Sequence, residues 1–435
     1  MKIRSFIYPS KKADRYLQKI INRAEEFPKK IEKEVKKIGD KVKKEGDKAL
    51  VEYTYKFDGV LFKPREFKVG KEEIEKAYKN ISSELLSAIK LAIEKVKKFH
   101  LKCLPQSWFM DEDSEIVLGQ MIKPVEIAGL YIPGGKGGET PLISTAIMTA
   151  VPAKIAGVEK IVMVSPPRRD KSLNSALLVA ANEAGVDEIY KIGGPWSIFG
   201  LAYGTETLPK VDIICGPGNI YVTIAKKLVS SFVGIDIVAG PSEVLIIADE
   251  TANPEFITWD LLAQAEHDPM SLAILITTSK KIAIEVKKLI PQALKKGFRS
   301  EIAKEALLKR GSIIIVKDLN TAFLLANLIA PEHLEIMIKD PMEYLPLVKN
   351  AGAVFLGVYT PEAMGDYIAG PNHVLPTMGF ARFTSSLSAE KFLKKINFLK
   401  YSPSALKKEA KKVIILAETE NLLSHAEAVR IRLKK

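Results

Sequence analysis

Apolar residues recur every three or four positions in the first hundred residues of the chain. The segment 28–48 mixes lysine with glutamate and aspartate around regularly spaced apolar positions, and residues 81–99 repeat the pattern. This spacing places apolar side chains on one helix face and charged ones on the other. We therefore expect a mostly helical N-terminal region with solvated, charged faces. The apolar positions of the first segment are Ile31, Val35, Ile38 and Val42.

The pattern changes near residue 124, where short β-branched runs begin to alternate with helical stretches rich in alanine and leucine. Uninterrupted apolar strands that alternate with helices are typical of parallel sheets covered on both faces, which predicts an α/β fold. The runs fall before and after about residue 241, so we expect two separate sheets. The last fifty residues return to a helical pattern. The apolar runs are 161–167, 188–194, 235–240, 244–249, 272–278, 312–316 and 353–357.

Composition narrows the class of protein. The 435 residues are enough for two or three domains. No apolar run approaches the roughly 18 residues that cross a bilayer, and no apolar signal core follows the basic N-terminus. The two cysteines, Cys103 and Cys215, are far apart and form no CxxC motif, which suits a reduced compartment. We therefore expect a soluble, cytoplasmic protein without a membrane partner.

The net charge of +13 raises the question of a nucleic-acid partner. The lysines alternate with acidic residues on predicted helix faces, and no basic run is interleaved with aromatic residues. We therefore expect no nucleic-acid partner. A non-catalytic nucleic-acid binder is the rival from another class, and salt-dependent retention on nucleic acid without turnover would identify it.

Glycine-rich turns follow several predicted strands, at 131–138, 192–195, 215–219 and 239–243. Glycine lets the backbone approach a ligand closely, and ligands of doubly wound sheets lie beyond the carboxyl ends of strands. None of the turns is a G-x-G-x-x-G that opens a helix, so the usual dinucleotide fingerprint is absent. A nucleotide site and plain tight turns both explain them.

The segment L-L-A-Q-A-E-H-D-P (261–269) resembles a helix end closed by Pro269. Gln264 and His267 are three residues apart and share one face of that helix. They belong either to a solvated helix end or to a pair of ligands for one metal, and the segment alone leaves both interpretations open.

The segment 365–379 is rich in glycine and proline, which predicts a structured loop that carries Asp366 and His373. A surface turn explains the glycines and prolines but not the histidine, so a functional loop is favoured. Four of the five histidines lie in punctuated segments of this kind, together with glutamine or acids. A Gln/His/Asp/His set suits Zn²⁺ and is also compatible with Mn²⁺ or Co²⁺.

The C-terminal segment 416–433 holds Glu420 and His425. Ser424 and Glu427 have the spacing of a capping box, which predicts that His425 lies in the first turn of the last helix. The helix dipole there disfavours imidazolium and so helps to keep a ligand histidine neutral. An amphipathic tail without a ligand role is the alternative.

Glu332 and His333 stand side by side in I-A-P-E-H-L-E-I (329–336). Pro331 disfavours helix at Ala330 and so helps to end the preceding element. The pair is therefore expected in a turn, where consecutive side chains can face one pocket, whereas in a regular strand they would point to opposite faces.

At these residues the chain resembles the histidinol dehydrogenase family, the enzymes that end histidine biosynthesis. The resemblance rests on several blocks that occur in the family's order over most of the chain. The blocks are G-L-Y-I-P-G-G, V-D-I-I-C-G-P-G-N, V-A-G-P-S-E-V-L-I-I-A-D, L-L-A-Q-A-E-H-D-P, A-P-E-H-L-E, N-H-V-L-P-T and S-H-A-E-A-V-R-I-R-L.

The resemblance implies a four-electron oxidation of L-histidinol to L-histidine through L-histidinaldehyde, in which two NAD⁺ are reduced in turn. It also implies one Zn²⁺ per subunit, which acts chiefly as a template that positions the substrate. The zinc ligands carried over by motif are Gln264, His267, Asp366 and His425. The substrate contacts are Ser242, His333, His373 and Glu420, together with the metal ligands.

The resemblance further implies an intertwined homodimer, in which the C-terminal tail crosses to the partner subunit. Glu420 and His425 would then complete the neighbour's site. The architecture expected is two Rossmann-like α/β domains with parallel sheets, a helical N-terminal segment and a helical tail. The expected boundaries are 1–27 for the N-terminal segment, 28–130 with 242–387 for the main domain, 131–241 for the second domain, and 388–435 for the tail.

The cofactor positions match the family at Tyr131 and Asn219 but differ at Trp196. The family usually has a glutamine there, which contacts the cofactor. Tryptophan can stack on a ring but cannot reproduce the hydrogen bonds of an amide. Cys215 lies in a glycine turn, but the family pattern does not support a covalent role, so we interpret it as a small packed residue.

For the catalytic pair, the hypothesis is that His333 accepts the alcohol proton as the first hydride leaves. Glu332 then activates water to attack the aldehyde, and His333 assists the loss of the second hydride. Imidazole has a pKa near neutrality, whereas a carboxylate needs surroundings that raise its pKa. The alternative is a paralogous zinc/NAD dehydrogenase of the same fold that acts on another polar alcohol, such as a sulfonated diol. The retained Glu420, His373 and His425 favour a substrate with imidazole and amine groups.

Overall fold

The computed structural model describes two compact units of the chain. The larger contains residues 1–103 and 126–392, and the smaller contains residues 104–125 and 393–435. Residues 136, 137 and 239, which belong to two of the predicted glycine turns, lie outside the described residues. The described ranges are 3–26, 29–112, 114–135, 138, 140–237, 240–297 and 299–434.

The larger unit contains a six-stranded sheet in which all neighbouring strands are parallel. The strand order is β1-β11-β10-β9-β12-β13. β9, β10 and β12 are buried at every residue, as expected for central strands of a parallel sheet that helices cover on both faces. The strands are β1 (Arg4–Ile7), β9 (Glu243–Ala248), β10 (Leu272–Thr277), β11 (Ser312–Ile315), β12 (His333–Met337) and β13 (Ala353–Leu356).

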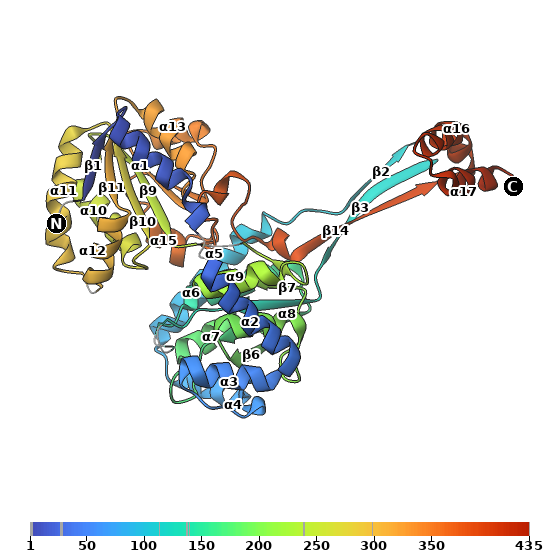
Figure 1. Cartoon of the computed structure of the whole chain (residues 1–435), viewed down its shortest axis with the longest axis horizontal. Coiled ribbons are helices and arrows are strands. Elements are labelled where there is room, and N and C mark those ends of the chain that lie inside the picture. Colours follow the sequence, from blue (N-terminus) through green and yellow to red (C-terminus); the bar gives the residue numbers. More distant parts are fainter. Residues whose placement is uncertain are drawn as a thin grey trace. The chain divides into compact units, whose positions relative to one another are not determined.

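Helices cover both faces of this sheet (Figure 1). α10, α11 and α12 share one apolar core with the sheet, and α1 and α13 share a second core on the opposite face. Successive residues of β9 alternate between the cores: Val244 packs in the first and Leu245 in the second. The helices are α1 (Lys11–Ile21), α10 (Pro254–Ala265), α11 (Lys280–Leu294), α12 (Ser300–Lys309), α13 (Leu319–Ile329), α14 (Pro341–Tyr344) and α15 (Glu362–Tyr367).

A second, five-stranded parallel sheet lies in the same unit, with the strand order β6-β5-β4-β7-β8. The chain moves outward from β4 to β6 and then returns to the other side of β4, so the order reverses between β4 and β7. Ligands of doubly wound sheets bind beyond the carboxyl ends of strands at such a switch point. The strands are β4 (Ile127–Tyr131), β5 (Lys160–Ser165), β6 (Glu188–Lys191), β7 (Ile213–Cys215) and β8 (Gly234–Ile235).

The helices of residues 29–101 pack with this second sheet rather than with the first. α2, α3, α8 and α9 contribute to one apolar core with it, and α5, α6 and α7 pack against one another. α2 buries Val35, Ile38 and Val42, as their spacing predicts. The helices are α2 (Lys29–Glu45), α3 (Asp47–Asp58), α4 (Lys71–Lys79), α5 (Ser83–Leu101), α6 (Ile143–Ala156), α7 (Ser175–Glu183), α8 (Gly194–Tyr203) and α9 (Ile220–Val229).

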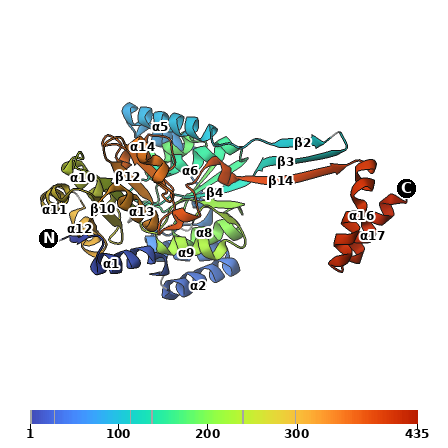
Figure 2. The same cartoon turned by 90° about the horizontal axis from the view of Figure 1, so that it is seen from above.

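The smaller unit is an antiparallel ribbon followed by two helices. Its strand order is β14-β3-β2, and α16 and α17 pack against each other beyond the ribbon (Figure 2). Many of its large apolar side chains are exposed, among them Phe109, Leu399, Leu416 and Leu423. The elements are β2 (Trp108–Glu112), β3 (Ile116–Pro124), β14 (Leu393–Tyr401), α16 (Pro403–Thr419) and α17 (Leu423–Leu433).

The α/β fold with two parallel sheets agrees with the sequence pattern, but four strands were not predicted. β1 joins the six-stranded sheet from the N-terminal region, and β2, β3 and β14 form the antiparallel ribbon. The capping box predicted in the tail is also wrong. Leu422 is the N-cap of α17, so Ser424 lies inside the first turn, although His425 does lie there. The expected domain boundaries stay a prediction, since both parallel sheets belong to one compact unit.

No helix within the described ranges combines the length and the apolar character that a bilayer span requires.

Short 3-10 turns connect several elements of the larger unit. The first, η1, directly follows α1 and begins at Arg23. These turns are η1 (Arg23–Glu26), η2 (Pro64–Glu66), η4 (Leu345–Leu347), η5 (Phe380–Arg382) and η6 (Ala389–Phe392).

Candidate active site

A cavity of about 640 Å³ lies between the two sheets of the larger unit. Pro133 and Asn219 line it from loops that follow the carboxyl ends of β4 and β7, at the switch point. Ser242 and His333 line it from the opposite side, at the amino ends of β9 and β12. A cavity of this size accommodates a small molecule and part of a cofactor.

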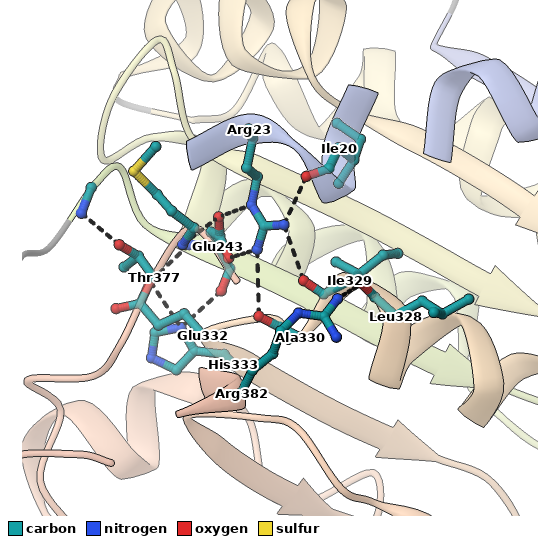
Figure 3. A network of polar contacts seen from close by, with 12 residues as sticks. Ile20, Arg23, Glu243, Leu328, Ile329, Ala330, Glu332, His333, Thr377 and Arg382 are labelled. Atoms are coloured by element: carbon teal, nitrogen blue, oxygen red, sulfur yellow. Dashed lines mark hydrogen bonds and ion pairs between the residues drawn. The ribbon is translucent and has the colours of Figure 1, made fainter. Parts of the chain in front are cut away.

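Glu332 and His333 reach the cavity where α13 ends and β12 begins (Figure 3). Ala330 closes the helix with a left-handed backbone, φ 50°, and Pro331 follows it, so the predicted helix end is confirmed. The prediction that both residues lie in a turn needs correction, because His333 is the first residue of β12. Glu332 lies directly before the strand. The rule that consecutive side chains of a strand point to opposite faces therefore does not apply to this pair, and both side chains can face the same cavity.

The strand β9 holds both members of this pair. The backbone N–H of Glu243 donates to Oε2 of Glu332 at 2.8 Å, and Nδ1 of His333 lies 3.0 Å from the carbonyl oxygen of Glu243. A carbonyl oxygen only accepts, so Nδ1 carries the proton and Nε2 presents an unprotonated lone pair. Nε2 is buried and has no hydrogen-bond partner among the described residues. Burial lowers the pKa of His333 to about 3, so the ring is neutral near pH 7.

Three carboxyl groups crowd beside this imidazole. Oxygens of Glu332 and Glu362 each lie 3.7 Å from Nδ1 of His333. Burial raises the pKa of Glu332 and of Glu362 well above the usual carboxyl range, and nearby acids add to both shifts. Burial also raises the pKa of Asp366 to about 6. A buried negative charge is costly unless a cation compensates it, so this cluster is suited to a divalent cation.

Glu362 is held from two directions. One end of the amide group of the buried Gln264 lies 2.8 Å from both carboxylate oxygens. The backbone N–H of Glu362 donates to Oε1 of the buried Glu335 at 2.9 Å. These contacts fix the carboxylate of Glu362 beside His333.

Three of the four predicted zinc ligands lie in this region. His267 and Asp366 line the cavity, and Gln264 lies behind Glu362. His267 follows the end of α10, where its N–H donates to the carbonyl oxygen of Gln264 at 3.3 Å. Asp366 lies on the short helix α15 rather than in the predicted loop. The donor atoms are imidazole nitrogen and carboxylate or amide oxygen, which fit Zn²⁺.

Ligand atoms of His333, Glu362 and Asp366 also lie within 4.8 Å of one another, close enough to surround one ion. The structure thus gathers more candidate ligands than one tetrahedral zinc needs. The predicted fourth ligand, His425, and the predicted substrate contact Glu420 are exposed residues of the smaller unit.

His373 occupies the loop in which it was predicted. Its Nδ1 lies 3.0 Å from the carbonyl oxygen of Asp366, and its Nε2 lies 3.3 Å from the hydroxyl of Thr145. Burial lowers the pKa of His373 to about 4, so this ring is also neutral near pH 7. Ser242, the other substrate contact predicted in the larger unit, lines the same cavity.

The glycine turn after β7 is fixed by the buried ion pair of Lys226 and Asp236. Lys226 donates to the carbonyl oxygen of Gly216 at 2.9 Å, and Asp236 accepts from the N–H of Gly216 at 2.7 Å. Gly216 has φ +123°, and a Cβ there would collide with the carbonyl oxygen of Tyr131, so the turn requires glycine. Asn219 then caps α9 beside the cavity, where helix N–H groups favour an anionic group.

Two other predicted cofactor residues, Tyr131 and Trp196, are buried in the apolar core of the five-stranded sheet. They are not among the described residues that line the cavity. The indole N–H of Trp196 donates to the hydroxyl of Thr54 at 3.1 Å, and the ring stacks on Phe57. Trp196 therefore fills a packing position, and its contact with a cofactor stays a prediction. Cys215 is fully buried, and burial raises the pKa of its thiol, which agrees with a packed residue.

Glu362 and Glu243 were not singled out from the sequence. Glu362 stands four residues before Asp366, so the two can share one helix face, and that spacing was the available signal. Glu243 gave no such signal because its contacts with Glu332 and His333 arise from the pairing of β9 with β12. Strand pairing of this kind depends on the fold and not on local sequence.

A cavity between two parallel sheets, lined by buried imidazole and carboxyl groups, is typical of an enzyme, and these groups are suited to acid–base chemistry on a small polar molecule. The family model for histidinol dehydrogenase matches residues 21–433, and the chain therefore belongs to the histidinol dehydrogenase family. It is thus an oxidoreductase of a family that acts in histidine biosynthesis.

Individual relatives agree with this assignment. The chain is 51% identical to histidinol dehydrogenase 2 of Trichormus variabilis over 89% of each chain. It is 49% identical to histidinol dehydrogenase of Carboxydothermus hydrogenoformans over 95% of this chain and 96% of the relative. The crystal structure of histidinol dehydrogenase from Elizabethkingia anophelis matches with a TM-score of 0.92 and 38% identity, over 99% of this chain and 98% of that chain.

Proposed function

We propose that the chain catalyses the zinc- and NAD-dependent four-electron oxidation of L-histidinol to L-histidine through L-histidinaldehyde. The observation that carries this proposal is the neutral, buried imidazole of His333, which has a free Nε2 and lies beside a cluster of carboxyl groups. Oxidation of an alcohol needs a proton acceptor for the hydroxyl, and oxidation of an aldehyde needs one for water. Membership of the family supports histidinol as the substrate.

Gln264, His267 and Asp366, together with His425, would hold one zinc ion per subunit. The bound ion would serve as a template that grips the imidazole and amino nitrogens of histidinol. Ser242, His373 and Glu420 would contact the substrate. The crowded carboxyl groups support a cation at this place, since a divalent charge would relieve the repulsion among them.

The residues of the chain would divide the proton transfers. His333 accepts the hydroxyl proton at Nε2 while the first hydride passes to NAD⁺, and the nearby carboxylate of Glu362 stabilises the positive ring. Glu332 then takes a proton from the water that attacks the aldehyde. His333 takes the proton of the resulting hydrate while the second hydride leaves. The first oxidation therefore releases one NADH and one proton. The second consumes one water, yields a carboxylate, and releases one NADH and two protons.

NAD would enter at the switch point of the five-stranded sheet, beside Asn219 and the N-terminus of α9. Tyr131 and Trp196 would complete this site from the core beneath it. The two free cysteines, Cys103 and Cys215, agree with the proposed cytoplasmic location.

The chain would act as a homodimer that exchanges its C-terminal tails. The smaller unit exposes apolar side chains on both its ribbon and its helices, and exposed apolar surface of this extent marks an interaction site. Glu420 and His425, which belong to this unit, would complete the site of the partner subunit. The exposed apolar residues are Trp108, Phe109, Met110, Met121, Ile396, Leu399, Val413, Ile415, Leu416, Leu422, Leu423, Ile431 and Leu433.

The reaction is tested by NADH release from L-histidinol before and after removal of metal. We expect two equivalents of NADH for each histidine formed, loss of turnover after chelation, and its return with Zn²⁺. One equivalent per product, or turnover that a chelator leaves unchanged, would contradict the proposal. Faster turnover of a sulfonated diol than of histidinol in the same assay would favour the paralogous dehydrogenase.

Tail exchange predicts that two inactive variants complement each other. His333→Asn damages the larger unit, and His425→Ala damages the tail, so each homodimer should be inactive. Unfolding and refolding the two variants together should yield heterodimers in which one of the two sites is intact. After random pairing about half of the dimers are heterodimers, so the mixture should have about a quarter of the wild-type activity. If each tail instead served its own subunit, every site would keep one lesion and the mixture would stay inactive.

A further inference from the structure

Arg23 is a buried arginine outside the cavity, on the turn η1 after α1. Its guanidinium pairs with the carboxylate of Glu243 through two parallel bonds, from Nε at 2.5 Å and from Nη2 at 2.6 Å. Both side chains are almost fully buried, at 1% and 2% exposure. A buried ion pair is costly to form and contributes little net stability, so its presence calls for another explanation.

The guanidinium also binds the helix end that precedes the catalytic pair (Figure 3). Nη1 donates to the carbonyl oxygen of Ile329 at 3.0 Å, and Nη2 lies 3.4 Å from that of Ala330. Nη1 further donates to the carbonyl oxygen of Ile20 at 2.8 Å. Carbonyl groups at a helix end lack partners within the helix, and here Arg23 supplies them. Arg23 thereby fixes the position of the backbone directly before Glu332 and His333.

Glu243, the partner of Arg23, contacts the catalytic pair through its own backbone. Its N–H binds Glu332, and its carbonyl oxygen sets the tautomer of His333. Its carboxylate also accepts from the N–H of Met378 at 3.0 Å, and the neighbouring Thr377 binds the N–H of Gly240 at 2.5 Å. The loop that carries His373 is therefore attached to β9 by the same carboxylate that Arg23 holds.

We propose that Arg23 is a positioning residue for the reaction, which acts through Glu243 to hold Glu332 and His333 in register. The inference rests on the proposed roles of Glu332 and His333. Arg23 joins the two chain segments that must meet for the site to form, the start of β9 and the end of α13. Lysine cannot take its place, because an ammonium group lacks the planar, five-donor fork that serves the carboxylate and the carbonyl oxygens at once.

The test uses Arg23→Lys in the zinc-loaded full-length enzyme, with rates expressed per folded, metal-containing subunit. We expect kcat to fall about 10- to 100-fold for both oxidations, since a displacement of about 1 Å has such an effect, while KM for histidinol changes little. Amide hydrogen exchange of Glu243 and Met378 should become faster. Unchanged kcat, or a loss that disappears once rates are normalised to folded enzyme, would overturn the proposal.

Arg382→Lys is the matched control. Arg382 is exposed and donates to the carbonyl oxygen of Leu328, near the same helix end, but it does not bind Glu243. This variant should keep the wild-type kcat and the wild-type exchange at Glu243. If Arg382→Lys slows the reaction as much as Arg23→Lys, the effect belongs to the helix end in general and the specific role of Arg23 is wrong.

A double variant separates positioning from stability. Arg23→Met with Glu243→Met removes both charges, and apolar replacement of a buried pair often preserves stability. The backbone of residue 243 remains, but the bonds to Ile329, Ala330 and Met378 are lost, so kcat should stay low. A double variant that regains wild-type kcat would overturn the proposal. Wild-type enzyme that produces no histidine would instead refute the proposed function, so the two failures are distinguishable.

Discussion

His333→Asn is expected to lower kcat about 10²- to 10⁴-fold in both oxidations, the usual contribution of a general base. The reason is the position of Nε2, the buried, unprotonated atom that accepts a proton in each step. Asparagine can still donate to the carbonyl oxygen of Glu243, so β12 should keep its place. The loss is measured by single-turnover NADH release from histidinol and, separately, from histidinaldehyde.

The control for this variant is His100→Asn. His100 is also buried, but it is not among the described residues that line the cavity. The control makes the same chemical change in the same type of environment, so it should leave kcat close to that of the wild type. If His333→Asn slowed only one of the two oxidations, a single base would not serve both, and the proposed division of labour would be wrong.

Glu332→Gln is expected to have an effect of similar size, but confined to the second oxidation. Oxidation of the aldehyde should slow about 10²-fold or more because the amide cannot take a proton from water, whereas oxidation of the alcohol should be nearly unchanged. The geometry should survive, since the amide oxygen can still accept the N–H of Glu243. Histidinaldehyde should accumulate after one equivalent of NADH, and trapping it with a carbonyl reagent provides the measurement.

The pH dependence supplies a second readout for the same residue. Burial raises the pKa of Glu332, and a general base works only when deprotonated, so aldehyde oxidation by the wild type should decline as the pH falls through that raised value. The Glu332→Gln enzyme should lack this acid limb. Glu343→Gln, a change at an exposed acid on α14, serves as the control and should keep it. Equal damage to both oxidations by Glu332→Gln would contradict the separate role of Glu332.

Local sequence predicted the elements of the site better than its contacts. The end of α13 before Glu332 followed from Pro331, and the amphipathic α2 followed from the spacing of its apolar residues. Both features depend on neighbours within a few positions along the chain. The antiparallel strands β2, β3 and β14 were missed because many of their residues are exposed and carry no clear two-residue alternation.

The residues that hold the catalytic pair came only from the structure. Arg23 and Glu243 are 220 positions apart, and neither stands in a motif that suggests contact with the other. Glu362 carried only a weak signal, its spacing from Asp366. For Trp196, the family resemblance suggested a cofactor contact, and the structure packs its ring against Phe57 in the core, so that contact stays a prediction.

The amino-acid sequence by itself thus determined the alternation of strands and helices, the two parallel sheets, and the types of side chain available for acid–base chemistry. These features follow from local periodicity and side-chain chemistry. Tertiary structure alone decided which carboxyl groups have raised pKa values, which nitrogen of His333 is free, and which arginine fixes its position. Those properties depend on burial and on partners brought together by strand pairing, and no short stretch of sequence contains them.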